Sequence, residues 1–100
     1  MRELNSRQRK YLSAKATLLN PVVMLGKEGA APGLIEALKA ALADHELVKL
    51  KFVGHKEERR ALALELAEAV DAALVRIIGN VAVYYRPCDE IEKRRFSLPD

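Results

Sequence analysis

The spacing of the hydrophobic residues changes repeatedly along this sequence, and glycines or prolines mark most of the changes. Three long stretches repeat apolar residues at intervals of three and four, which predicts helices with one buried face. Four shorter stretches are rich in β-branched residues or alternate in polarity, which predicts strands. The predicted helices span residues 6–17, 31–45 and 57–71. The predicted strands span residues 21–25, 47–53, 73–78 and 81–86.

The order of these elements, α-β-α-β-α-β-β, restricts how they can be arranged. Strands separated by a helix usually lie parallel and are joined by right-handed crossovers. The last two strands follow each other directly and can form an antiparallel hairpin. We therefore predict one α/β (α+β) domain over residues 1–100, with a four-stranded mixed sheet packed against helices. The chain from about residue 88 is expected to be a polar, mobile tail.

The predicted hairpin turns at Gly79-Asn80, and glycine at the first position of a two-residue loop favours a type II′ turn. The resulting register pairs three couples across the hairpin, namely Ile78 with Val81, Arg76 with Val83, and Leu74 with Tyr85. The face expected to enter the core carries Val75, Ile77, Ala82 and Tyr84. The outer face of the sheet is expected to be exposed and to carry Lys49, Lys51, Arg76, Val83 and Tyr85.

Composition excludes several classes of function. Seventeen basic and fourteen acidic residues give a net charge of +3, which suits RNA, a membrane surface or an acidic protein about equally. The single cysteine, Cys88, can form no internal disulfide, and two histidines without further cysteines indicate no metal site. No nucleophile stands with a base and an orienting group, so we expect no enzyme activity, cofactor or small-molecule substrate. No apolar run reaches the roughly 20 residues that span a membrane, and the polar N-terminus does not resemble a secretory signal, so we expect a cytoplasmic protein. We also expect it to be monomeric.

The loop Gly26-Lys27-Glu28-Gly29 lies between a predicted strand and a predicted helix, and two interpretations are open. The glycines can serve a tight turn that needs positive φ. Alternatively, they let the backbone approach a phosphate closely, as the GxxG loop of KH domains does. The spacing of two glycines alone favours the turn.

Basic residues in three predicted elements can form one phosphate-binding surface. The first helix carries Arg7, Arg9, Lys10 and Lys15. The second strand adds Lys49 and Lys51, and the glycine loop adds Lys27. If these elements converge, they favour binding to RNA by shape, with little reading of bases. On the same face, Tyr85 can stack on a base or pack against the first helix or the tail, and these alternatives are equal.

Three segments together resemble the CRM domain, the RNA-binding module of chloroplast splicing factors and of bacterial YhbY-type proteins. The first strand and its loop match in PVVMLGKEG, residues 21–29. The second strand matches in DHELVKLK, residues 44–51, and the closing hairpin in IGNVAVYYRP, residues 78–87. The chain departs from the family's usual pattern at Glu28 and at 30–32, so Lys27 and the helix N-terminus must outweigh one carboxylate.

This resemblance implies a fold similar to the C-terminal domain of bacterial translation initiation factor three. The single-domain length resembles the bacterial YhbY proteins, which implies binding to ribosomal RNA in precursors of the large ribosomal subunit and a role in ribosome maturation. The residues expected to contact RNA are Gly26, Lys27, Gly29, Arg7, Arg9, Lys10, Lys15, Lys49, Lys51, Arg76, Tyr85 and Arg86. The alternative is a protein-interaction module that docks on a ribosomal protein or assembly factor through apolar positions of the outer sheet face.

Overall fold

The computed structural model of the chain describes residues 1–29 and 32–100. Its helices are α1 (Ser6–Ala16), α2 (Pro32–His45) and α3 (Arg59–Ala69), with a 3₁₀ turn, η1 (Ile91–Lys93), in the tail. Its strands are β1 (Val23–Leu25), β2 (Leu47–Phe52), β3 (Ala73–Ile78) and β4 (Val81–Tyr85). The predicted order of elements is confirmed; the expected first residue of the second helix, Ala31, lies outside the described residues.

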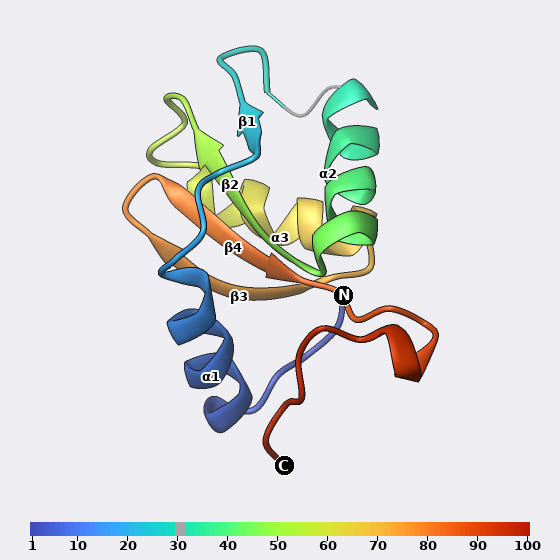
Figure 1. Cartoon of the computed structure of the whole chain (residues 1–100). Helices are drawn as coiled ribbons and strands as arrows, with labels where there is room; N and C mark the ends of the chain where they lie inside the picture. Colours follow the sequence, from blue (N-terminus) through green and yellow to red (C-terminus); the bar gives the residue numbers. More distant parts are fainter. Residues whose placement is uncertain (30–31) are drawn as a thin grey trace.

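The four strands form one mixed sheet in the order β1-β2-β4-β3. β1 and β2 are parallel and β3 and β4 form an antiparallel hairpin, as the sequence predicts. The position of β4 between β2 and β3 was not predicted. Gly79 has φ 59°, the positive value that the first position of a type II′ turn requires. Figure 1 shows α2 and α3 on one face of the sheet and α1 on the other.

The hairpin register is as predicted next to the turn but shifts further along. Leu74 pairs with Tyr84, whereas the alternation of the sequence predicted Tyr85. The cause is a bulge at Val75, which turns this side chain to the α1 side of the sheet, so its predicted place in the core with Tyr84 is wrong. The Nε of Arg9 donates to the carbonyl oxygen of Val75 at 2.8 Å, which satisfies the bulged backbone from α1.

The sheet has a hydrophobic core on each face. The larger core, against α2 and α3, includes Phe52, Leu66 and Tyr84, and the hydroxyl of Tyr84 donates to the carbonyl oxygen of Ala63 at 2.8 Å. Pairing this hydroxyl offsets the cost of burying it. The smaller core lies under α1 and is made by Leu12, Ala16, Leu47, Val75, Val83 and Tyr85. No helix in the described ranges is both long enough and apolar enough to cross a membrane.

The smaller core overturns the expectation of an open outer face. Val83 and Tyr85 were expected to be exposed, but their exposed fractions are 0% and 3%. The ring of Tyr85 packs edge-on against Phe96 of the tail, with the ring centroids 6.2 Å apart. Of the two alternatives for Tyr85, packing against the first helix or the tail is therefore confirmed.

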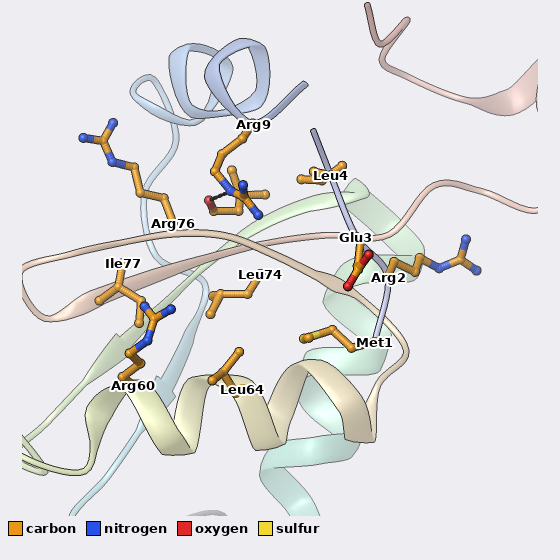
Figure 2. A pocket seen from close by; sticks show the side chains of 11 residues that line it. Met1, Arg2, Glu3, Leu4, Arg9, Arg60, Leu64, Leu74, Arg76 and Ile77 are labelled. Carbon is orange, nitrogen blue, oxygen red and sulfur yellow. Dashed lines mark hydrogen bonds between the residues drawn. The ribbon is translucent and has the colours of Figure 1, made fainter. Parts of the chain in front are cut away.

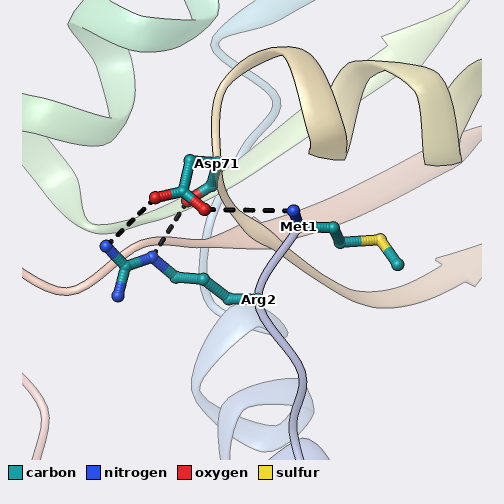
Figure 3. Close-up of polar contacts among 3 residues, drawn as sticks. All are labelled: Met1, Arg2 and Asp71. Atoms are coloured by element: carbon teal, nitrogen blue, oxygen red, sulfur yellow. Dashed lines mark hydrogen bonds and ion pairs between the residues drawn. The ribbon is translucent and has the colours of Figure 1, made fainter.

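The tail is positioned by Glu46, a carboxylate with only 2% of its surface exposed. Its two oxygens accept hydrogen bonds from the backbone nitrogens of Cys88 at 3.0 Å and Arg95 at 2.9 Å. These charge-assisted bonds hold both ends of the η1 turn close to the start of β2. At the other terminus, Arg2 and the amino group of Met1 contact the carboxylate of Asp71 (Figure 3).

Candidate nucleic-acid interface

The glycine loop is a closed turn in which the two glycines have different tasks. The backbone nitrogen of Gly29 donates to the carbonyl oxygen of Gly26 at 3.1 Å. Gly29 has φ 87°, a conformation that side chains disfavour, so it is the glycine that the turn requires. A methyl group added to Gly26 would lie 3.2 Å from Oε2 of Glu28, so the backbone there is closely approached. The turn interpretation is confirmed, and the contact with RNA stays a prediction.

The two side chains between the glycines carry opposite charges, and both are exposed. The carboxylate of Glu28 folds back beside Gly26. An anion that approached the backbone of Gly26 would meet this carboxylate. The negative charge of Glu28 therefore opposes that of Lys27. Because the side chain of Glu28 is exposed and flexible, it can move away from the loop.

Two residues that sequence reasoning did not select tie the glycine loop to its neighbours. His55, in the loop between β2 and α3, places Nε2 2.9 Å from the carbonyl oxygen of Gly26, and because a carbonyl only accepts, the ring must donate. Arg59 donates to the carbonyl oxygens of Gly79 at 2.6 Å and Gly54 at 3.5 Å. The same guanidinium lies over the ring of Phe52. Three loops are thus joined at one end of the sheet, toward the upper left in Figure 1.

The lysines of β2 lie on the α1 side of the sheet, as predicted. Lys51 is exposed and pairs with Met24, two residues before Gly26, so it extends the glycine loop onto the sheet. Nζ of Lys49 donates to the carbonyl oxygen of Leu19, in the segment that follows α1. Together they connect the loop with the first helix.

The predicted basic residues of α1 differ in how free they are. Arg7 and Lys10 are exposed, and no ion pair within the described residues involves them. Arg9 is held at the β3 bulge, and Lys15 lies 5.4 Å from the ring centroid of Tyr11. Arg76 is exposed on β3 next to this helix. The convergence of α1 and β2 on one face is therefore confirmed.

Two predicted contact residues lie elsewhere. Tyr85 is buried, so its ring cannot stack on a base in this structure. Arg86 follows β4, and its backbone nitrogen donates to Glu46, which precedes β2. The glycine loop follows β1 at the level where β2 ends. Arg86 and the loop are therefore at opposite ends of the sheet.

Acidic, histidine and cysteine side chains form no site for a metal ion within the described parts of the chain, because no three of them gather together.

Comparison with known proteins identifies the family. Residues 4–86 match the CRS1 / YhbY (CRM) domain. The chain belongs to this family. An RNA-binding protein of Haemophilus influenzae is 38% identical to this CRM domain over 91 residues, which cover 90% of this chain and 92% of the relative. A probable RNA-binding protein of Pseudomonas aeruginosa is 36% identical, with 83% of this chain and 81% of the relative covered.

The fold of this CRM domain is also found among solved structures. The solution structure of a hypothetical protein from Staphylococcus aureus, described as an RNA-binding candidate, superposes with a TM-score of 0.84. The two chains are 30% identical, and the match covers 97% of this chain and 100% of the other. The predicted CRM resemblance and the mixed-sheet fold are therefore both confirmed.

Proposed function

We propose that this CRM-domain chain binds structured RNA through the glycine loop and the basic face shared by α1 and β2. The observation that carries the proposal is the family match over residues 4–86, whose relatives are named as RNA-binding proteins. The exposed cations Lys27, Lys51 and Lys10 support it, because phosphate contacts need solvent-accessible Lys or Arg side chains.

The aromatic residues indicate how RNA is held. The chain has five, and the structure uses each of them in packing. Phe52, Tyr84 and Tyr85 are buried, Phe96 packs on Tyr85, and Tyr11 lies against the smaller core beneath Lys15. Because no ring among the described residues is fully exposed, we expect affinity to come chiefly from phosphate contacts and shape, and the complex to be sensitive to salt.

For the identity of the RNA, we propose ribosomal RNA in precursors of the large subunit, bound in the cytoplasm during ribosome maturation. The support is the match to the CRS1 / YhbY (CRM) domain and the resemblance of this chain to bacterial YhbY-type proteins. Binding by shape also suits a large folded RNA better than a short single-stranded motif.

Crosslinking in cells, followed by sequencing of the attached RNA, tests this proposal. The expected result is a cluster of crosslinks in large-subunit ribosomal RNA, with the protein sedimenting with immature particles on gradients. Crosslinks spread over messenger RNAs, with no enrichment on ribosomal RNA, would contradict the ribosomal assignment but leave RNA binding intact.

A second candidate function, docking on a ribosomal protein or assembly factor, is favoured by apolar side chains on the open part of the sheet. Met24, Lys51, Val81 and Ile78 pair in this order across the four strands and so form one row of the sheet. The exposed fractions of the two end residues, Met24 and Ile78, are 59% and 49%. Complete RNase digestion separates the two functions. Association with ribosomal proteins that survives digestion favours docking, and association that is lost favours RNA.

A further inference from the structure

A hollow lined by arginines runs along the outer edge of the sheet, at β3, where Arg2 pairs with Ala73. Its volume is about 670 Å³, and it lies between α1, α3 and the N-terminal segment. Arg2, Arg9, Arg60 and Arg76 reach it from four different parts of the chain. Figure 2 shows Arg9 on α1 and Arg60 on α3 on opposite sides of β3. We call this hollow the arginine groove.

The groove continues onto the basic face of the first helix. A second hollow shares Arg9 and Arg76 with it and extends along α1 past Lys10. The arginine groove therefore joins the surface already assigned to RNA from the side opposite β1. Arg2 and Arg60 were not among the residues expected to bind RNA, because only the fold brings them to this edge.

Two of the four arginines have no internal partner in the described part of the chain. Arg2 pairs with Asp71, and Nε of Arg9 donates to the bulged carbonyl of Val75. Within residues 1–29 and 32–100, Arg60 and Arg76 make neither an ion pair nor a side-chain hydrogen bond. Glu3 is the one acidic residue in the lining, so the groove carries a surplus of positive charge.

The composition of the groove fits a nucleic-acid strand. All its cationic side chains are arginines, whose planar guanidinium binds phosphate oxygens in pairs, whereas the loop and β2 present lysines. Leu64, Leu74 and Ile77 line the α3 side of the groove and remain partly exposed. An apolar wall beside unpaired arginines can receive sugars and base edges while the phosphates face the guanidinium groups.

We propose that the arginine groove holds a second strand segment of the bound RNA by its sugar–phosphate backbone, with Arg60 and Arg76 contacting phosphates. This inference rests on the proposed RNA-binding function and adds a site at the sheet edge opposite β1. Charged residues on an edge strand can also serve only to prevent pairing with another chain. An acidic peptide is another ligand that a positively charged groove can bind. The experiment must therefore distinguish RNA binding from protection of the sheet edge and from binding of an acidic peptide.

The test is a salt titration of a labelled RNA hairpin with a single-stranded flank, for the wild-type protein and the double variant Arg60→Gln/Arg76→Gln. Losing two phosphate contacts should lower the slope of log affinity against log salt by about 1.5 and weaken binding about tenfold. Arg60→Lys/Arg76→Lys should keep the slope but bind more weakly, because lysine keeps the charge and loses the paired geometry.

The matched control is Lys39→Gln/Lys93→Gln, which removes the same charge from exposed residues outside the groove. If the salt slope falls equally in the control, or falls in neither variant, the groove does not bind RNA. The proposed RNA-binding function still holds in that case if binding depends on Lys27. Wild-type protein that does not bind the hairpin overturns both. Self-association of the Gln variant with unchanged RNA binding, or tighter binding of poly-glutamate than of RNA, also overturns the groove.

Discussion

Nε2 of His55 lies 2.9 Å from the carbonyl oxygen of Gly26, so the loop before α3 holds the first glycine of the loop after β1. The same carbonyl accepts from the backbone nitrogen of Gly29. One oxygen atom therefore links the closure of the glycine turn to a neighbouring element. We therefore expect His55 to position the loop that carries Lys27.

Replacing His55 tests this role. His55→Ala should cost about 1 kcal/mol of stability, the usual net value of one hydrogen bond. It should weaken RNA binding about threefold to tenfold, because the loop must then be ordered on binding. Hydrogen exchange should speed up at the amide of Gly29. His55 also has φ 56°, a value that glycine adopts without strain and alanine does not. Comparing His55→Gly with His55→Ala therefore separates the effect of the lost hydrogen bond from that of backbone strain. Loss of stability without any change in exchange or affinity would contradict the role.

Glu28 is expected to oppose binding. Glu28→Gln keeps the size of the side chain and removes the carboxylate beside Gly26, so RNA affinity should rise about twofold to fivefold at low salt. Unfolding midpoints should stay unchanged because the side chain is exposed. Glu92→Gln, in the tail, is the matched control for net charge. An equal rise in the control would show that only overall charge changed.

Glu46 is expected to determine whether the tail stays docked. Glu46→Ala removes the acceptor for the backbone nitrogens of Cys88 and Arg95, which should cost about 2–4 kcal/mol. The tail should become sensitive to protease, and the ring of Tyr85 should become accessible. Glu90→Ala, an exposed residue of the same tail, should change little. If the tail of Glu46→Ala stays resistant to protease, the packing of Phe96 on Tyr85 is sufficient to hold the tail in place.

Stability should fall at alkaline pH because of two buried phenols. Burial raises the pKa of Tyr84, and burial with the carboxylate of Glu46 raises the pKa of Tyr85. A raised pKa means that the folded state keeps a proton that the unfolded state releases. This stabilisation is complete below pH about 10 and is lost as the pH rises above that value. Thermal unfolding from pH 8 to 11 should show the decline.

Tyr84→Phe isolates the larger part of this effect. Near pH 8 it should be less stable than wild type by about 1 kcal/mol, because the bond to Ala63 is lost. Its stability should fall less steeply above pH 10, so the two curves approach each other. Parallel curves would show that Tyr84 does not contribute to the alkaline decline.

The sequence was sufficient for the local and periodic features of this protein. Alternation and turn chemistry predicted the order of the elements along the chain, the Gly79-Asn80 hairpin and the two faces of β2. The glycine loop was also found, because its spacing and its place before a helix are visible in one short segment.

The errors arose where distant segments meet. The bulge at Val75 has no local signal in the sequence, and its carbonyl oxygen accepts a hydrogen bond from the side chain of Arg9, which is distant along the chain. Tyr85 was misplaced because the tail, which is polar in sequence, brings Phe96 over the sheet. For the same reason, neither the hydrogen bond of His55 nor the approach of Arg60 to β3 could be predicted from spacing.

The most direct test of RNA binding through the glycine loop and α1 is a salt-dependent titration of a structured RNA with Lys27→Glu/Lys10→Glu. Both side chains are exposed, so the variant should keep the unfolding curve of the wild type. Its affinity should fall about tenfold or more, and its salt slope should decrease by about 1.5. Unchanged affinity and an unchanged salt slope in a folded variant would contradict RNA binding through the glycine loop and α1.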